Sequence, residues 1–233
     1  MVKLVIIRTI LEYIVYTAET MPFIFCVFQR KKINTKDNKA FFVYSALVVL
    51  FLSSVISFKY ILHNPHIGLL IGRLFLVVEC TLLSLFFYYN LKSSKRAYFL
   101  VIGIGLILSL FFYDLLTNTD KPSFLPLATE GFFFIFIILY FFYERVNYIT
   151  DVPLYSLPSF WISVGLLISF SGTFFLYLVS VTMAQDPSFR NLYNSIYGTF
   201  TVIKNVLLCV GIYSIQIDLS KIKELKLIPN LDL

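Results

Sequence analysis

The sequence predicts an all-α integral membrane protein built as a bundle of seven transmembrane helices. Of its 233 residues, 59% are apolar and only 14% are charged, whereas a soluble domain carries about 25% charged residues. Seven apolar stretches approach the roughly 20 residues that a helix needs to cross a bilayer. Backbone groups cannot stay unpaired in lipid, so such stretches form helices or a closed barrel. They are about twice as long as barrel strands, which selects helices.

Polar or proline-containing sequence bounds each span. Glu12, Glu19 and Pro22 interrupt the first span, and no small-residue cleavage site follows it, so we expect it to be retained rather than removed as a signal peptide. The expected spans cover residues 7–28, 41–62, 67–89, 97–116, 129–147, 160–182 and 195–216. The segments between them are the basic stretch 29–39, the His-Asn-Pro-His turn at 63–66, segments 92–96 and 147–158, and the proline-containing segments 117–128 and 183–194.

Lys and Arg are divided unequally between the two sets of loops, and cytoplasmic loops carry the excess in multi-pass proteins. One side holds Arg30, Lys31, Lys32, Lys36, Lys39, Lys92, Lys95, Arg96, Arg145, Lys221, Lys223 and Lys226. The other side holds Lys3, Arg8, Lys121 and Arg190. We therefore expect a multi-pass protein of the cytoplasmic (inner) membrane with the N-terminus outside and the C-terminus in the cytoplasm. Residues 1–216 would form the bundle and residues 217–233 a short cytoplasmic amphipathic tail.

Two opposite charges are expected near the middle of the bilayer, where charged side chains usually face the bundle interior. Glu79 is close to the centre of the third span, and Lys204 is close to the centre of the seventh. We expect them to meet, with Glu19 of the first span as a second partner for Lys204. Polar residues at a helical spacing extend this stripe along the seventh span. The candidate polar core or ligand site is Glu19, Glu79, Tyr197, Thr201, Lys204 and Asn205.

A second charged cluster is expected nearer the outer side of the bundle. Arg73 is about one and a half turns inside the outer end of the third span, so it can reach Asp114 or Glu130. Lys59, Asp114 and Glu130 are close to outer helix ends, from which a charged head can extend to water. Arg73, Asp114 and Glu130 therefore form a predicted outer charged cluster.

Small residues predict close helix packing. Gly165, Ser169 and Thr173 recur every four residues in the sixth span, a pattern that lets two helices approach closely. Gly105 and Ser109 form a shorter version in the fourth span. The three cysteines, Cys26, Cys80 and Cys209, all fall inside apolar runs and are expected to be buried thiols.

Known enzyme, metal and nucleic-acid signatures do not explain the sequence. It contains no GxSxG, Walker or HExxH motif. His63 and His66 share one short loop without a third ligand, so no metal is expected. The net charge of +6 arises from residues between apolar runs, where loops meet lipid headgroups, and does not indicate nucleic-acid binding. Retinal attached to Lys204 is an alternative, but the single Trp161 leaves no aromatic box, so no cofactor is expected.

Three stretches carry a likeness to a known group. They are GRLFLVVECTLLSLFFYYN with Glu79, LPSFWISVGLLISFSGTFF with Trp161 and Gly172, and NSIYGTFTVIKNVLLCVGIY with Asn205. The chain thereby resembles uncharacterised seven-helix membrane proteins of Bacteroidetes-type bacteria. The resemblance implies a sensing or signalling role coupled to a sensor histidine kinase, because members of the group commonly occur beside or fused to such kinases. Lys204 has no counterpart in this resemblance.

Three functions follow as hypotheses. The first is a receptor-like signalling subunit that binds a small or lipophilic ligand in a polar pocket and acts on a cytoplasmic partner such as a histidine kinase. The second is a membrane lipid hydrolase that uses Glu19, Glu79 or Asp114 as general acid or base. The third is a small transporter or channel, which requires a continuous polar path across the bundle.

Overall fold

The computed structural model describes residues 2–60, 65–93, 96–117, 125–147, 153–183 and 187–226. Within these residues the chain forms seven α-helices and two short 3-10 helices, and no β-strand. The α-helices are α1 (Val2–Phe28), α2 (Lys36–Tyr60), α3 (Pro65–Asn90), α4 (Arg96–Thr117), α5 (Leu125–Asn147), α6 (Pro158–Met183) and α7 (Pro187–Lys226). The 3-10 helices are η1 (Arg30–Lys32) and η2 (Leu154–Ser156). The all-helical class with seven membrane-spanning candidates is confirmed, because all seven α-helices are long and apolar enough to cross a membrane.

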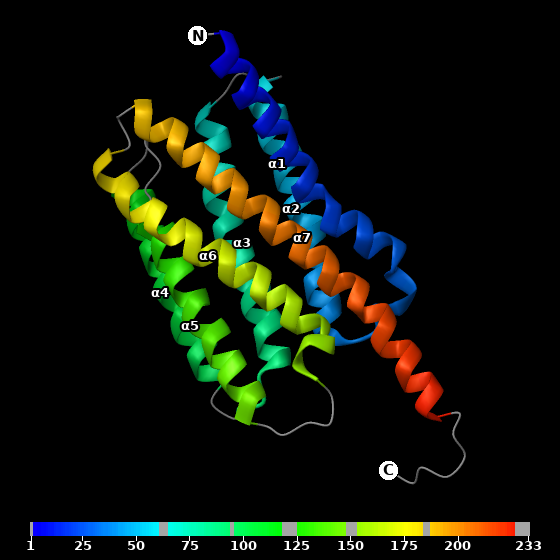
Figure 1. Cartoon of the computed structure of the whole chain (residues 1–233). Coiled ribbons are helices and arrows are strands. Elements are labelled where there is room, and N and C mark those ends of the chain that lie inside the picture. The colour runs from blue at the N-terminus through cyan, green and yellow to red at the C-terminus, as the bar shows by residue number, and fades with distance from the viewer. Residues whose placement is uncertain are drawn as a thin grey trace.

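The helices run up and down as an antiparallel bundle (Figure 1). α7 packs between α1 and α6, while α2 packs against α3 and α5 against α6. The beginning of α1 and the end of α7 consequently lie at opposite ends of the bundle (Figure 1).

α7 is much longer than its expected span. The part long and apolar enough to cross a membrane is Leu192–Ile215, but the helix continues to Lys226. At about 1.5 Å per residue its 40 residues extend about 60 Å, against about 30 Å for the hydrocarbon core. The first part of the expected tail therefore continues α7, and its last residues, 227–233, lie outside the described residues. Figure 1 shows the end of α7, in red, projecting beyond the other helices.

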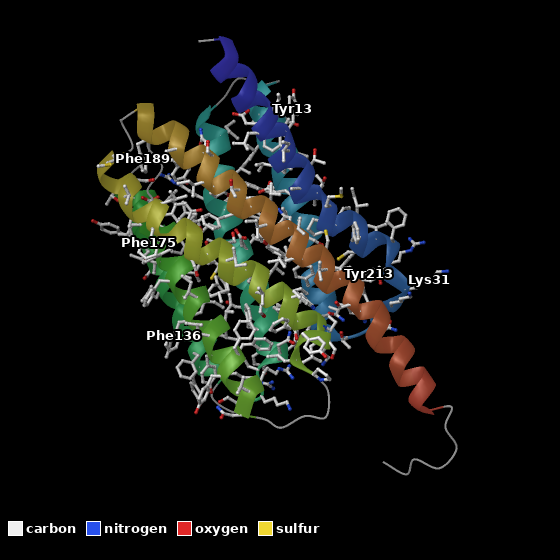
Figure 2. All side chains as sticks on the ribbon, viewed as in Figure 1. Tyr13, Lys31, Phe136, Phe175, Phe189 and Tyr213 are labelled. Atoms are coloured by element: carbon white, nitrogen blue, oxygen red, sulfur yellow. The ribbon has the colours of Figure 1, made fainter. Side chains whose placement is uncertain are left out.

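The outer surface of the bundle carries large apolar side chains. Phe136 and Phe175 are 57% and 68% exposed and extend away from the helices (Figure 2). Contiguous exposed apolar surface on this scale is typical of contact with lipid.

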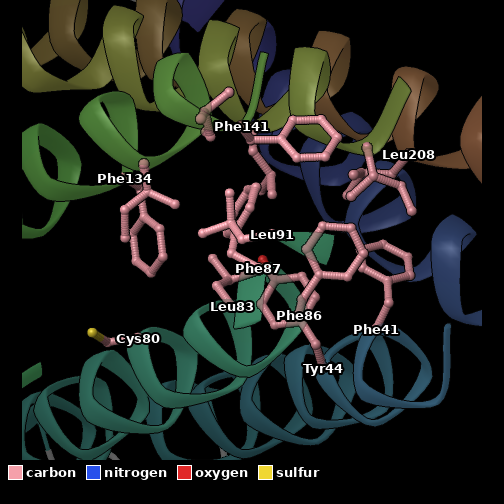
Figure 3. Close-up of a cluster of buried hydrophobic side chains, with 14 of the residues drawn as sticks. Phe41, Tyr44, Cys80, Leu83, Phe86, Phe87, Leu91, Phe134, Phe141 and Leu208 are labelled. Atoms are coloured by element: carbon pink, nitrogen blue, oxygen red, sulfur yellow. The ribbon is translucent and has the colours of Figure 1, made fainter. Parts of the chain in front are cut away.

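A packed aromatic core fills the half of the bundle nearer the end of α7. Its largest fully buried members are Phe41, Phe86, Phe87, Phe134, Phe141, Leu83, Ile162, Leu208 and Ile212, several of which Figure 3 shows in contact. In α3 most of the core residues, from Cys80 to Phe87, come late in the helix, and in α7 the core residues Leu208, Ile212 and Ile215 lie in its second half. In α2 and α6, which run the other way, Phe41 and Ile162 lie near the start.

Glycines bring α6 and α7 close together, as the small-residue pattern predicts. A methyl group added at Gly165 would lie 3.0 Å from the Lys204 backbone oxygen. The same addition at Gly172 would overlap the Phe200 ring. The expectation for α4 is wrong in detail: Gly105 is exposed with nothing within 4 Å, whereas Gly103 packs against Phe133. α4 therefore turns Gly103, rather than Gly105, toward α5.

α5 fixes the connection between α3 and α4. Both carboxylate oxygens of the buried Glu144 accept backbone N–H groups, from Lys92 at 2.8 Å and Ser93 at 2.9 Å. Arg145 donates to the Asn90 carbonyl at 3.1 Å. These contacts satisfy amides that follow the end of α3, where no helical partner remains.

Candidate functional site: a polar cavity between seven helices

A cavity of about 360 Å³ lies inside the bundle, and every one of the seven helices contributes to its wall. One wall residue from each helix, in chain order, is Glu19, Tyr44, Glu79, Asp114, Glu130, Tyr177 and Lys204. Its volume falls in the range of about 300–1,000 Å³ that small-molecule sites occupy.

The cavity occupies the half of the bundle nearer the beginning of α1. In α3 the wall residues 72–79 precede most of the core residues, which run to Phe87, and Leu76 belongs to both sets; in α7 the wall residues 193–204 precede the core residue Leu208. In α6, which runs the other way, the core residue Ile162 precedes the wall residues 166–177. The polar cavity and the aromatic core thus divide the bundle along its length.

Three of the expected charges, Glu19, Glu79 and Lys204, line the same cavity. The Tyr44 hydroxyl donates to Glu79 Oε1 at 2.9 Å. Lys204 acts electrostatically on both Glu19 and Glu79. The direct contact expected between Glu79 and Lys204 is not formed, since no ion pair within 4.0 Å joins these two described side chains. Tyr44 already holds one Glu79 oxygen, and Lys204 lines the same cavity as Glu19 and Glu79.

The predicted outer cluster belongs to the same cavity. Arg73 Nε lies 3.3 Å from Asp114 Oδ2, so the expected pairing of Arg73 with Asp114 is formed. Asp114 and Glu130 are only 5% and 3% exposed. The expectation that they extend outward to water is wrong, because α4 and α5 turn them inward to the cavity wall. The Lys59 side chain lies outside what the structure describes.

Glu130 is a polar group of the cavity wall with an unsatisfied buried atom. Its Oε1 atom is buried and has no hydrogen-bond partner. Glu79 is a second carboxyl group on the wall of the same cavity. A buried carboxyl oxygen without a partner is costly unless another group, such as a ligand or an ordered water, completes it.

The polar residues expected to form one stripe on α7 lie in two different environments. Tyr197 and Lys204 line the cavity. Thr201 and Asn205 are buried but do not line it, and the Asn205 amide donates to the Thr201 carbonyl at 2.9 Å. Asn205 instead reaches a largely apolar groove between α1 and α7. Successive helical residues point about 100° apart, which explains how neighbours 204 and 205 face different ways.

The sequence analysis missed the aromatic part of the wall. Tyr44, Tyr177 and Tyr193 all line the cavity. The Tyr193 and Tyr197 rings stack with centroids 6.0 Å apart, and Phe51 and Phe75 stack at 4.1 Å. Tyr193 and Tyr197 are four residues apart and therefore share a face of α7. This spacing is the sequence feature that could have indicated an aromatic wall in a chain with 16 Tyr and 26 Phe.

Other singled-out residues lie away from the cavity wall. Trp161 donates from its indole to the Tyr155 carbonyl at 2.8 Å, where η2 meets α6. Among the described residues no group of three His, Cys, Asp or Glu side chains is placed to hold a metal ion. His63 lies outside those residues, and so does the side chain of His66. Cys26 and Cys80 are buried thiols, whereas Cys209 is partly exposed.

Comparison of the chain with models of protein families, with curated proteins and with solved structures finds no match. The cavity itself is therefore the basis for the functional argument.

Proposed function

We propose that the chain is a receptor-like signalling subunit that binds a small ligand in the cavity between its seven helices. The observation that carries this proposal is that side chains of all seven helices meet around one cavity. A ligand that contacts every helix can favour one packing of the bundle over another, which is the physical requirement for a conformational signal.

α7 supplies a route from the cavity to the opposite end of the bundle. It contributes Tyr193, Tyr197 and Lys204 to the wall and then continues without interruption to Lys226. A shift or rotation of α7 at Lys204 would therefore displace its projecting end, because a continuous helix moves as a stiff element. Small helix shifts of this kind are common in signalling proteins.

The proposed arrangement places the protein in the cytoplasmic membrane of a bacterium. The distribution of Lys and Arg supports an outside N-terminus and a cytoplasmic end of α7. The cavity would then open toward the outer half of the bilayer, and the projecting end of α7 would contact the partner. A sensor histidine kinase is the proposed partner, on the strength of the family resemblance.

The alternatives find less support in the geometry. A channel needs a continuous polar path, but fully buried Phe41, Phe86, Phe87 and Phe141 pack the half of the bundle beyond the cavity. A hydrolase using Asp114 as general base would have to withdraw it from Arg73 at 3.3 Å. The receptor hypothesis requires neither change.

Site-specific photo-cross-linking in the source bacterium tests the proposal. A benzophenone amino acid in place of Lys223, on the projecting part of α7, should cross-link a histidine kinase. The yield should change when Lys204→Met removes the charge that faces Glu19 and Glu79, and Lys204→Arg should retain the wild-type yield.

The matched control places the same cross-linker at Lys31 in η1, which should not show the dependence on Lys204. Absence of a kinase adduct at position 223, or an adduct indifferent to Lys204→Met in a correctly inserted protein, would contradict the proposal.

A further inference from the structure

The charges of the cavity wall do not balance. Four acidic and two basic side chains line it. The acids are Glu19, Glu79, Asp114 and Glu130, and the bases are Arg73 and Lys204. Arg73 is engaged by Asp114 at 3.3 Å. Glu19, Glu79 and Glu130 then share the cavity with one remaining base, Lys204. A buried carboxyl without a positive partner holds a proton instead of a charge, so a positive group that enters the cavity can take the place of that proton.

Glu130 marks where the positive group would lie. It is 3% exposed, lines the cavity and leaves Oε1 without a hydrogen-bond partner. No ion pair within 4.0 Å joins Glu130 to a basic side chain among the described residues. Glu130 is thus a wall carboxyl with no cation at ion-pair distance in the described part of the chain.

Aromatic rings line the same cavity as this carboxyl. Tyr177 and Tyr193 both belong to the wall, and their ring centroids lie 6.5 Å apart. Tyr193 in turn stacks on Tyr197. The faces of such rings attract cations, most strongly in sites removed from water. Phe51, Phe75 and Phe170 add apolar wall to the same cavity.

We propose that the cavity binds a small organic cation, an amine with an apolar body, whose ammonium group pairs with Glu130 against the rings of Tyr177 and Tyr193. This inference rests on the proposed function in taking the cavity as the ligand site. A bare metal ion fits less well, because no three ligand side chains converge among the described residues. An anion would face three carboxyl groups and one lysine.

Calorimetry on the full chain in lipid nanodiscs provides the test. The probes are 2-phenylethylamine and its neutral counterpart 2-phenylethanol, which differ in the ammonium group. We expect saturable binding of the amine and at least tenfold weaker binding of the alcohol. Glu130→Gln should weaken amine binding at least tenfold and leave the alcohol unchanged, and Glu12→Gln, which removes a carboxyl outside the cavity wall, should leave both unchanged.

A second variant keeps the test decisive where Glu130→Gln does not fold. Tyr193→Leu preserves every carboxyl group but removes one aromatic face, and it should weaken amine binding several-fold. Equal binding of amine and alcohol would overturn the inference, and so would no binding of the amine. The inference would also fail if a folded Glu130→Gln or Tyr193→Leu protein bound the amine as tightly as wild type.

The two proposals fail in different ways. Selective amine binding that leaves the α7 cross-link unchanged would remove the signalling function and keep the cation site. A cross-link that depends on Lys204 while amine and alcohol bind alike would remove the cation site and keep the signalling function.

Discussion

Tyr44 and Glu79 form the best-defined polar contact of the cavity, at 2.9 Å. The Tyr44 hydroxyl lies at the boundary between cavity and core, since Tyr44 both lines the cavity and belongs to the buried cluster. Its hydrogen bond therefore fixes one Glu79 oxygen where water is largely excluded. Hydrogen bonds to a charged acceptor contribute about 1.5–3 kcal/mol in soluble proteins, and hydrogen bonds between membrane helices contribute less, about 0.6 kcal/mol on average.

Tyr44→Phe should lower the free energy of unfolding by about 1–2 kcal/mol, because Glu79 loses a buried donor. Unfolding by a denaturing detergent, followed by circular dichroism, measures the change. Tyr213→Phe is the matched control, since Tyr213 is 53% exposed on the outer surface, and it should have no effect. Equal stability of Tyr44→Phe and wild type would contradict the assignment.

At the residue scale the sequence identified the charged groups better than their partners. Mid-span position alone indicated Glu79 and Lys204, and both line the cavity. The position of a residue in its span could not show that Tyr44 would donate to Glu79, or that Asp114 and Glu130 would turn inward. These contacts depend on how each helix is rotated about its axis in the bundle. Depth along a span follows from residue number, whereas rotation depends on the packing of neighbours.

At the element scale, the contact of α6 with α7 determines where Lys204 lies. Gly165 allows the α7 backbone at Lys204 to approach, and Gly211 does the same nearer the end of the span, where an added methyl group would lie 3.0 Å from the Pro158 oxygen. Without side chains at these points the two helices pack closely. The close approach positions the lysine that serves the cavity.

Gly165→Ala should lower the free energy of unfolding by about 1–3 kcal/mol, the usual cost of overpacking. The added methyl group would press on the backbone oxygen of Lys204, which cannot rotate away. Gly105→Ala is the control: it has open space in α4 and should be neutral or raise stability by up to about 1 kcal/mol, because Ala favours helix. A Gly165→Ala protein as stable as Gly105→Ala would refute the close contact.

Glu144 gives a second prediction about elements. Glu144→Ala should speed hydrogen exchange at the Lys92 and Ser93 amides, since both lose their acceptor. Exchange in the middle of α3 should stay unchanged. Glu12→Ala, a carboxyl deletion on α1, should leave both amides protected, and unaltered exchange in Glu144→Ala would show that the connection is held by other contacts.

The number of helices followed from the sequence because apolar length alone decides whether a segment can span a bilayer. The length of α7 did not follow from the sequence. Residues 216–226 are too polar for a span, and they contain no pattern that marks the end of the helix. The small-residue pattern found Gly165 in α6 but selected Gly105 over Gly103 in α4, because spacing does not show which face meets a neighbour.

At the scale of the whole molecule, the bundle divides into a polar half and an apolar half. The cavity gathers six acidic and basic side chains, and the aromatic core closes the bundle beyond it. The sequence predicted one polar centre and a separate outer cluster, because it placed the two sets of charges at different depths. Their union in one cavity needed the three-dimensional packing of all seven helices.

The central claim is that Lys204 stabilises the carboxyl groups opposite it across this cavity. A double-mutant cycle on Glu79→Gln and Lys204→Met tests that claim most directly, with the free energy of unfolding as the readout. Removing one member leaves the other buried without compensation, whereas removing both does not. The account predicts that the double variant is more stable than the sum of the two losses implies, by about 0.5–3 kcal/mol. Losses that add to within about 0.3 kcal/mol would contradict it.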